Sequence, residues 1–474
     1  MEANQPSTLP AAPQPQAETP DPLSSSAVAP QPVVAVIGAG PAGLFAAREL
    51  ALHGVHVFVF NRDIKPGGLA EYGIYPGKTR MKEGLRAQFR QILDTPGLEY
   101  YGNLVIGEHG DLTLDDLREM GFQALLVAVG AQATKWAGIP GEDLKGVYHA
   151  KDIVYHYNRL PPYVDMELAI GRRVAVVGVG NVMIDIAHWL LEEKKVDEVI
   201  AIARRGPGEV KFDRKELESI IGYLDVSAVQ MELQRVTPQM VQVGQDPATM
   251  REMIAALLEK KPPVAASPAF RIQFLASPVR ILGDAQGRVC GLELEQTMLV
   301  RKSNGETVAH GMGLYYTLEV DTVIFAIGDR VDSSLGLPIE GNEFCKNPQP
   351  RFPKDGMSYE VYDPAAGKVI EDVFVVGWAR KASTGVVGLA RKDGINGAHA
   401  LLDYLATLPP RQVSVENIRA RLSALGKPLV TRADLLRLEQ AEHERAARLG
   451  LPEFKFEHNL EMLQVMGLLQ PLIG

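Results

Sequence analysis

The residues of this sequence that could do chemistry include a first group of glycines behind a buried strand. Gly38, Gly40 and Gly43 form a GxGxxG pattern directly after the apolar run 33–37 and at the start of an amphipathic stretch. The first glycine allows a tight turn, the second lets backbone approach a pyrophosphate, and the third lets helix pack on strand. Helix N-terminal amides then face the phosphates. This context predicts a dinucleotide site rather than a mere tight turn.

The residue that ends the second strand of this unit is Asn61. An acid at this position normally accepts hydrogen bonds from ribose hydroxyls, whereas an Asn carbonyl accepts a weaker, uncharged one. We therefore expect the chain still to bind the dinucleotide, but less tightly. The alternative is that Asn61 is only a turn residue. Gly67, Gly68 and Gly73 follow in the segment 65–76, where they allow backbone to lie against a flat ligand; the alternative is a flexible surface loop.

A second strand–turn–helix unit, "VAVVGVGNVMIDIAHWL", carries Gly178 and Gly180. Met183 stands where a small residue would normally let the helix pack closely on the strand. Its larger side chain predicts a greater distance between helix and strand at this point. The second strand of this unit ends in Arg204 and Arg205 rather than in an acid. Two guanidiniums suit an adenosine 2′-phosphate, which an acid would repel. The pair therefore predicts NADP(H) over NAD(H), and the alternative is a solvated basic turn.

The elements around these motifs alternate between apolar strands and amphipathic helices, which is typical of a parallel sheet covered on both faces. Alternating strands with turns occupy 271–318. The buried strands 320–329 and 371–379 are then expected to return to the first unit, followed by a helix at 388–405. The fold class is therefore α/β, with two Rossmann-like dinucleotide-binding domains, the second inserted in the first.

The expected domain limits follow from this order. The first domain takes 33–150 and 320–474 and ends in a helical extension, and the inserted domain takes 151–319. The turn-rich segment 138–147 is expected to cross between them. Residues 1–32 are rich in Pro and Ala and lack the basic and apolar stretches of a signal peptide, so we expect a disordered tail.

The composition sets limits on the function. The chain has 474 residues, 46% hydrophobic and 23% charged, with a formal net charge of -9, which indicates a soluble globular protein and disfavours nucleic acid as a partner. Cys290 and Cys345 form no CxxC, so neither a dithiol pair nor a cysteine-held iron–sulfur cluster is predicted. Low cysteine use favours the cytoplasm, and no apolar run is long enough to span a bilayer.

Two dinucleotide units in one chain predict one tightly held flavin and one exchanging nicotinamide, with hydride passing between them. The flavin carries the chemistry and the protein supplies geometry and electrostatics, so no side-chain nucleophile is required. The histidines are scattered, and none stands at metal-ligand spacing with Cys or Asp. No metal site is therefore predicted.

At this point the motifs resemble a known family, the adrenodoxin-reductase-like ferredoxin–NADP⁺ reductases. The similarity runs over about 33–467. The most specific stretches are 139–161, "GNVMIDIA" at 180–187, "RRGPGEVKFDRKEL" at 204–217 and "GWARKASTGVVG" at 377–388. The resemblance implies FAD in the first domain and NADP(H) in the inserted one.

With the glycine motifs, the resemblance implies two sets of binding residues. The FAD set is Gly38, Gly40, Ala42, Gly43, Asn61, Gly68, Leu69, Ile106, Gly130, Trp378, Gly385, Val386 and Val387. The NADP set is Gly178, Val179, Gly180, Asn181, Val182, Arg204, Arg205, Glu216 and Gly385. A glycine at 385 would let nicotinamide and isoalloxazine meet closely. Trp378 would cover the flavin ring, and the alternative is a core aromatic.

The chain departs from the family pattern near the flavin. Gly77 and Lys78 stand where the family commonly has Asp-His, so a proton relay through that His is not expected. Lys78 would place positive charge there and favour an anionic reduced flavin. The alternative is a solvated surface lysine.

The resemblance also implies an acidic ferredoxin-like iron–sulfur protein as the electron partner, steered by basic residues. Lys211, Arg214 and Lys215 resemble the family's docking segment. Further charge near the flavin segment is expected from Arg380, Lys381, Arg391 and Lys392.

Two other functions remain open from the sequence. One is an NADPH-oxidising flavin subunit of a larger complex, like the small subunit of glutamate synthase, although that family carries cysteine-rich segments and this chain has two cysteines. The other is a non-enzymatic nucleotide-binding regulator, favoured only by Asn61 and Met183.

Overall fold

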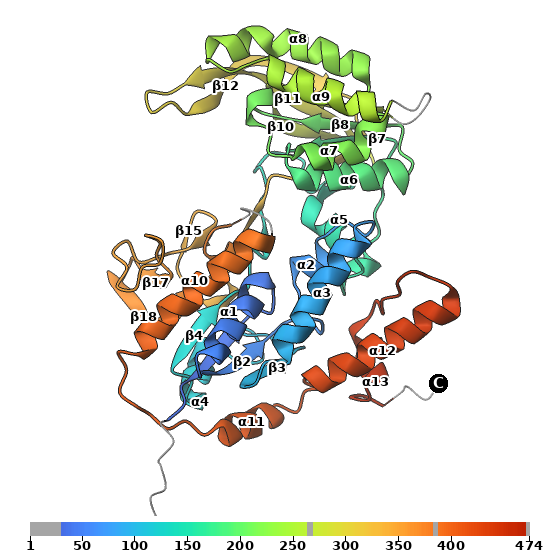
Figure 1. Cartoon of the computed structure of the whole chain (residues 1–474). Helices are drawn as coiled ribbons and strands as arrows, with labels where there is room; N and C mark the ends of the chain where they lie inside the picture. The colour runs from blue at the N-terminus through green and yellow to red at the C-terminus, as the bar shows by residue number, and fades with distance from the viewer. Residues whose placement is uncertain (1–29, 263–268, 383–386, 471–474) are drawn as a thin grey trace, which may run out of the picture.

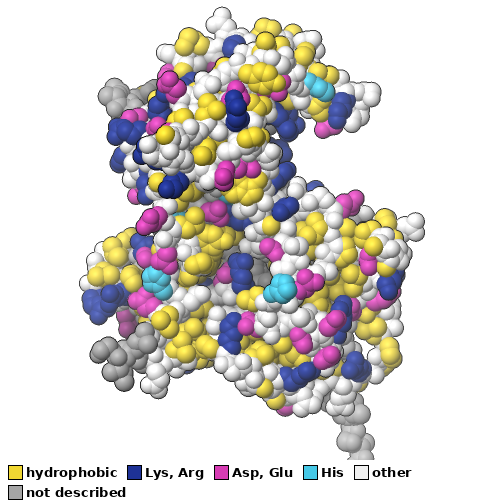
Figure 2. Space-filling view, turned by 180° about the vertical axis from the view of Figure 1, so that it is seen from behind, with side chains coloured by type: hydrophobic (Ala, Val, Ile, Leu, Met, Phe, Trp, Pro, Cys, Tyr) yellow, Lys and Arg dark blue, Asp and Glu magenta, His cyan; other side chains and the backbone are white. Residues whose placement is uncertain are grey.

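The computed structural model describes residues 30–262, 269–382 and 387–470, which form two lobes joined at a narrow waist (Figures 1 and 2). The lower lobe in Figure 1 is built on a six-stranded sheet. In spatial order its strands are β17 (Glu360–Asp363), β18 (Lys368–Val375), β4 (Ala124–Val127), β1 (Val33–Ile37), β2 (His56–Phe60) and β3 (Leu98–Tyr101). All pairs are parallel except that of β17 with β18.

Strand β1 at the centre of the first sheet is apolar at every position because both of its faces are covered. Val34 and Val36 of β1 pack among the helices α1 (Pro41–Leu52), α3 (Thr79–Leu93) and α10 (Val387–Leu405). Val33, Ala35 and Ile37 face the opposite way, toward α4 (Leu114–Met120) and α11 (Val415–Ser423). This two-residue alternation between two cores is the expected geometry of a doubly covered parallel strand. The predicted α/β class is confirmed.

The upper lobe is built on a five-stranded parallel sheet. Its strands, in spatial order, are β6 (Val147–His149), β13 (Thr322–Phe325), β7 (Arg173–Val177), β8 (Glu198–Ile202) and β9 (Ala269–Gln273). One face packs on α5 (Ala150–Tyr157), α6 (Asn181–Glu192), α7 (Arg214–Ile220), α8 (Val226–Gln242) and α9 (Ala248–Lys260). The other face is covered by the antiparallel sheet β10 (Ala276–Gly283), β11 (Val289–Arg301) and β12 (Thr307–Leu318).

The expected return of the strand 320–329 to the first sheet is wrong. Thr322 pairs with Val174 of β7, and Phe325 pairs with His149 of β6, so β13 belongs to the second sheet. The second sheet therefore includes strands on both sides of the predicted 151–319 limits. The apolar pattern of β13 shows that it is buried, but it carries no information about which of two parallel sheets buries it.

The chain crosses between the lobes along two paired segments. β5 (Ala133–Thr134) and β14 (Asp329–Arg330) form a short antiparallel ladder, so the outgoing and returning connections lie side by side. The crossing lies before the predicted segment 138–147. A Cβ on Gly141 would lie 2.4 Å from the Ile281 carbonyl oxygen, which shows that this segment already packs on the upper lobe.

The C-terminal extension packs back on the lower lobe. Its helices are α12 (Arg432–Leu449) and α13 (Asn459–Val465), and the short helix beside it is α2 (Leu69–Tyr72). Lys455 pairs with Glu71 of α2 at 2.7 Å, and Arg86 of α3 pairs with Glu71 and Glu453 at 2.6 Å. These ion pairs hold the extension against the glycine-rich segment. A hairpin of β15 (Ile339–Glu340) and β16 (Glu343–Phe344) completes the elements.

None of the described helices combines the length and the apolar character needed to cross a membrane.

A buried lysine beside this ion cluster makes the stability of the protein depend on pH. Lys82 is 2% exposed and donates to Asn158 Oδ1 at 3.1 Å; burial, and then Lys455, lower its pKa to about 7. Between pH 7 and the ordinary lysine value the unfolded chain binds more protons, so this residue makes stability rise with pH in that window. We predict that the free energy of unfolding of the wild type, minus that of Lys82→Met, rises by about 2 kcal/mol from pH 7 to 9.

Equilibrium urea unfolding at the two pH values measures this difference. The exposed Lys145→Met variant is the control and should show no such rise. If the difference in free energy of unfolding between the wild type and Lys82→Met does not change with pH, the buried amine keeps its proton throughout this range.

Candidate functional site

The first glycine loop has the three distinct environments that the motif predicts. Gly38 has φ +108°, and a Cβ there would lie 2.6 Å from the Ala128 carbonyl oxygen at the end of β4. A Cβ on Gly43 would lie 2.0 Å from the Gly38 carbonyl oxygen. A Cβ on Gly40 would meet no atom within 4 Å. The outer two glycines therefore pack β1, β4 and α1 together, whereas the middle one borders open space.

The second glycine-rich segment lies across this loop. The Gly67 amide donates to the Ala39 carbonyl at 2.7 Å, and a Cβ on Gly68 would lie 3.2 Å from the Cα of Gly40. Gly68 has φ +50° and precedes Leu69, the first residue of α2. Two predicted FAD positions from separate motifs, Gly40 and Gly68, thus meet at the N-terminus of α1.

Asn61 ties these two loops together. Its Oδ1 accepts from the Ala39 amide at 3.0 Å, and its Nδ2 donates to the carbonyls of Asp63 at 2.8 Å and Lys65 at 3.0 Å. An acid could not make the two donor contacts. Asn61 is therefore a structural link as well as a candidate ligand, because its oxygen has two lone pairs and the Ala39 amide uses one.

The turn that carries Trp378 lies on the same end of α1. Gly377 has φ +67°, and a Cβ there would lie 2.8 Å from the Cβ of Ala42. The Gly377 amide donates to Asp393 Oδ2 of α10 at 2.6 Å, and a Cβ on Gly394 would lie 2.2 Å from the Ala42 carbonyl oxygen. The packing of α10 and of Gly377 on Ala42 thus places the turn that carries Trp378 next to this predicted FAD residue.

The other predicted FAD residues make none of the contacts described above, and their positions in the fold are as follows. Gly130, with φ +70°, follows β4, and Ile106 is buried in the core beneath the sheet. Val387 is the first residue of α10 and is half-buried. Gly385 and Val386 lie outside the described residues, so their proposed roles stay predictions.

The glycine loop of the upper lobe repeats the geometry of the first. Gly178 has φ +125°, and a Cβ there would lie 2.3 Å from the Ala326 carbonyl oxygen after β13. A Cβ on Gly180 would again meet no atom within 4 Å, and this residue caps α6. Met183 is fully buried among apolar side chains, where its flexible thioether fills the space that a small residue would leave.

A neighbouring segment supports this second loop. Asn181 Nδ2 donates to Asp213 Oδ2 at 2.9 Å, and the Asp213 amide donates back to Asn181 Oδ1 at 2.8 Å. The Lys211 amide donates to the Val179 carbonyl at 2.9 Å, and Val182 is 44% exposed. The predicted docking segment therefore begins at the edge of the predicted NADP loop.

The two arginines after β8 have fixed backbones and available side chains. The Arg204 carbonyl accepts from Thr297 Oγ1 at 2.7 Å, and the Arg205 carbonyl accepts from the Leu275 amide at 3.3 Å. Arg204 is exposed and Arg205 half-buried, and neither makes an ion pair within the described residues. The arrangement presents two uncompensated cations beside the second loop, as a phosphate clamp requires.

Lys78 is not the bare cation that the sequence led us to expect. Its Nζ lies 2.7 Å from Glu216 Oε2 and 3.0 Å from Asp185 Oδ1, both in the upper lobe. Burial opposes its charge, but these two carboxylates raise the pKa of the Lys78 ammonium above its ordinary value. Nearby, Tyr75 stacks on His188 with ring centroids 4.6 Å apart. Lys78 therefore joins the lobes, and Glu216, a predicted NADP residue, is its partner.

Some of the cations predicted to dock the partner are exposed and make no ion pair in the described structure, whereas others are paired with acidic side chains. Lys211, Arg214 and Lys215 are all exposed, and none makes an ion pair within the part of the chain that the structure describes. Arg380, in contrast, is 6% exposed and paired with Asp393, so the expectation that it adds surface charge is wrong.

Two other cations expected near the flavin segment, Arg391 and Lys392 of α10, also contribute less free charge than expected. Lys392 is exposed but lies 2.9 Å from Asp355, which offsets its charge. Arg391 lies over the ring of Phe45 at 4.9 Å. The segment at 211–215 is therefore the stronger candidate surface for an acidic partner.

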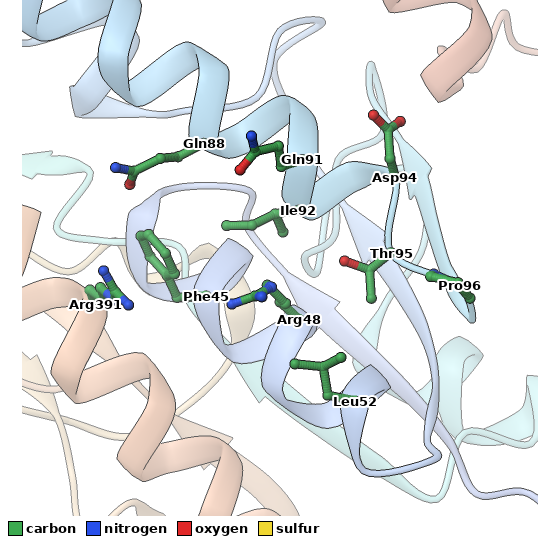
Figure 3. Close-up of a pocket in the computed structure, with 10 residues that line it drawn as sticks. All are labelled: Phe45, Arg48, Leu52, Gln88, Gln91, Ile92, Asp94, Thr95, Pro96 and Arg391. Carbon is green, nitrogen blue, oxygen red and sulfur yellow. The ribbon is translucent and has the colours of Figure 1, made fainter.

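A shallow hollow of about 440 Å³ lies between α1 and α3 (Figure 3). It is lined by Phe45, Arg48, Leu52, Gln88, Gln91, Ile92, Asp94, Thr95, Pro96 and Arg391. None of these residues belongs to the predicted nucleotide sets, and the hollow is open to solvent. We assign it no role in nucleotide binding.

Comparison with known proteins places these loops in a family context. Residues 32–351 match the family described as pyridine nucleotide-disulphide oxidoreductase. The chain is 26% identical to the NADPH-ferredoxin reductase FprA of Mycobacterium leprae, over 91% of this chain and 98% of that protein. It is 28% identical to the mitochondrial NADPH:adrenodoxin oxidoreductase of Mus musculus, over 92% of each.

A solved structure shares the fold. Mycobacterium tuberculosis FprA in complex with NADPH matches with a TM-score of 0.77 and 24% identity. The match covers 92% of this chain and 99% of that one, so it includes both lobes.

Proposed function

Because the chain belongs to the pyridine nucleotide-disulphide oxidoreductase family, we propose that it is an FAD-dependent reductase that passes electrons from NADPH to a ferredoxin-like iron–sulfur protein. The observation that carries this proposal is the pair of glycine loops, each closed at its first glycine, Gly38 or Gly178, and open at the next, Gly40 or Gly180. The unpaired arginines beside the second loop supply the preference for NADPH.

The residues of the lower lobe fit FAD. Gly40 borders a space that a Cβ would reduce, at the N-terminus of α1, where helix amides face a pyrophosphate, and Gly68 packs against Gly40 there. Ala42 and Trp378 flank this end, and Asn61 holds the loops in register. When bound, FAD supplies the chemistry that links a two-electron donor to a one-electron acceptor.

The residues of the upper lobe fit NADPH. Gly180 lets backbone approach the pyrophosphate at the N-terminus of α6, and Arg204 and Arg205 bind the 2′-phosphate. We assign this binding to the unit built on the second sheet, which spans 147–325. Glu216, held by Lys78 at the junction, orients the end of the nucleotide nearest the lower lobe.

The iron–sulfur partner docks on Lys211, Arg214 and Lys215. We predict that replacing all three by alanine raises KM for an acidic ferredoxin about tenfold at low salt, because exposed charges mainly steer encounter. The effect should fade as salt is added. Steady-state assays with ferredoxin over a range of NaCl concentrations measure it.

Two controls separate docking from nucleotide binding. NADPH oxidation with ferricyanide as acceptor should change little in the triple variant. A second triple variant, made at the exposed Lys145, Lys194 and Lys368, removes the same charge elsewhere and should keep the parent KM for ferredoxin. Equal losses in both triple variants would show that net charge, and not this segment, attracts the partner.

The direct test of the proposed function is ferredoxin-dependent reduction of cytochrome c by NADPH. The proposal expects a rate that depends on all three components. Oxidation of NADPH with artificial acceptors, but with no ferredoxin reduced, would contradict it.

We propose the cytoplasm as the compartment. Cys290 and Cys345 are both free thiols, which is the usual state in a reducing environment.

A further inference from the structure

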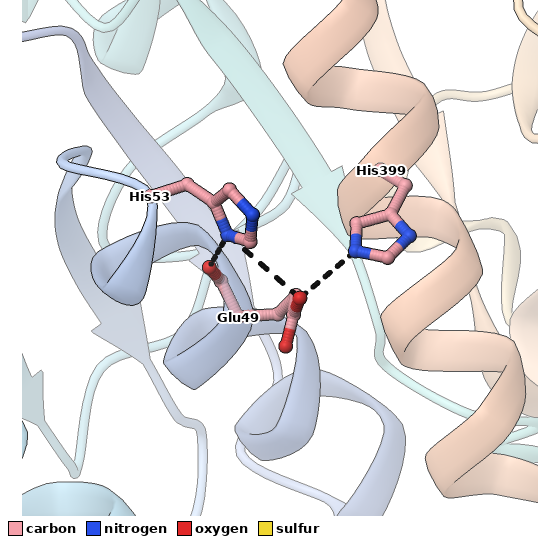
Figure 4. A group of neighbouring side chains, drawn as sticks. All are labelled: Glu49, His53 and His399. Atoms are coloured by element: carbon pink, nitrogen blue, oxygen red, sulfur yellow. Dashed lines mark hydrogen bonds and ion pairs between the residues drawn. The ribbon is translucent and has the colours of Figure 1, made fainter.

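Three side chains with no part in either nucleotide site meet where the C-terminal end of α1 lies beside α10 (Figure 4). Glu49 lies in the last turn of α1 and His53 caps that helix, whereas His399 comes from α10. Glu49 Oε1 lies 2.8 Å from His399 Nε2 and 3.7 Å from His53 Nδ1. One ligand atom from each residue lies within 4.8 Å of the other two.

We propose that Glu49, His53 and His399 bind a divalent transition-metal ion, with Zn²⁺ the best match. Two imidazoles and one carboxylate are the donor set of three-ligand zinc sites, in which water takes the fourth position. Tetrahedral bonds of about 2.0–2.1 Å place neighbouring donors about 3.3 Å apart. The Glu49–His399 and Glu49–His53 separations of 2.8 and 3.7 Å bracket this value, and the two ring nitrogens lie within 4.8 Å of each other, so side-chain rotations would complete the geometry. Mg²⁺ and Ca²⁺ are poor matches because they prefer oxygen donors.

The surroundings of the cluster leave room for an ion. The side chains of His53 and His399 are 51% and 39% exposed, and that of Glu49 is 21% exposed. An ion can therefore enter from solvent and keep a bound water. The two rings already face each other with centroids 5.8 Å apart, and the Glu49 carbonyl accepts from His53 Nδ1 at 2.8 Å. The carboxylate and the two rings are thus held close together, and an ion bound at His53 Nδ1 would replace the proton that this atom donates to the Glu49 carbonyl.

The position of the site gives the ion a structural role. α1 and α10 also meet at the other end of α1, where Ala42 contacts Gly394 beside the FAD residues. Ala42 and Glu49 are seven residues apart, about 10 Å along the helix. An ion bound at Glu49 would join the two helices a second time, behind the cofactor site. It would stabilise the lower lobe without touching either nucleotide.

The test uses the flavin-loaded protein, stripped of metal with EDTA and titrated with ZnCl2 by calorimetry. All proteins in the test carry Cys290→Ser, because an exposed thiol can itself bind Zn²⁺ and would add to the measured binding. We expect one Zn²⁺ per chain. His53→Ala and His399→Ala should each weaken binding at least about tenfold, and Glu49→Gln should do the same while keeping the side-chain size. His310→Ala, which removes an exposed histidine of β12, should bind as the parent does.

Thermal unfolding gives a second readout that does not depend on activity. Zn²⁺ should raise the Tm of the flavin-loaded parent and of His310→Ala, but not that of His399→Ala. The proposal is overturned if the parent shows no saturable binding, or if the variants at Glu49, His53 and His399 bind Zn²⁺ as tightly as the parent. Failure here leaves the proposed reductase function untouched, because none of these residues belongs to the nucleotide sites.

Discussion

Replacing Arg204 and Arg205 together by alanine will lower kcat/KM for NADPH about a hundredfold and leave kcat/KM for NADH nearly unchanged. Each guanidinium has no acidic partner among the described residues and stands after β8, where we propose that the 2′-phosphate binds. A hydrogen bond to a charged group contributes about 1.5–3 kcal/mol, and exposure of these side chains favours the low end. Two such losses give about 3 kcal/mol, which corresponds to the hundredfold change.

The control for this prediction is another exposed arginine without an ion pair in the described structure. Arg48→Ala removes one positive charge, half of that lost in the double variant, from α1 of the lower lobe and should leave kcat/KM for both nucleotides unchanged. The double lysine variant at 204 and 205 should recover part of the preference for NADPH, because charge remains while the bidentate geometry is lost. An equal fall with NADPH and NADH would contradict a phosphate clamp and indicate a structural role.

Gly40→Ala will give a folded protein without bound flavin, whereas Gly180→Ala will keep the flavin and bind NADPH poorly. A Cβ at either position meets no protein atom within 4 Å, so the empty protein accommodates it. The methyl group instead occupies the space that a pyrophosphate needs at a helix N-terminus. We expect flavin occupancy below about one-tenth in the first variant and KM for NADPH raised at least about tenfold in the second.

Gly43→Ala is the matched comparison, because its Cβ would lie 2.0 Å from the Gly38 carbonyl oxygen. It should lower the unfolding temperature as well as flavin content, since α1 must move off β1. The absorbance ratio at flavin and protein bands, together with thermal unfolding by circular dichroism, distinguishes the three variants. Stoichiometric flavin in Gly40→Ala would show that the first loop does not bind the pyrophosphate.

The parts of the molecule that the sequence predicts are those set by local patterns. Gly38 and Gly178 must take positive φ, and the apolar runs around them must be buried strands, whatever the rest of the chain does. The position of the arginine pair is likewise local, because the pair directly follows the buried strand β8. These features required no knowledge of distant partners.

The parts that the sequence does not predict depend on partners far along the chain. Lys78 meets Asp185 and Glu216 only because the lobes fold together, and Arg380 is buried only because α10 carries Asp393 beneath it. Asn61 looks like a lost ligand until its amide is seen to join two loops. No spacing rule connects these residues, so only the tertiary structure assigns their roles.

The most direct test of the central claim is an anaerobic absorbance titration of the purified protein with NADPH, repeated with NADH. The account predicts a flavin spectrum that NADPH bleaches at about one equivalent and that NADH bleaches poorly. A colourless protein, or a flavin that neither nucleotide bleaches, would contradict it and favour a nucleotide-binding regulator.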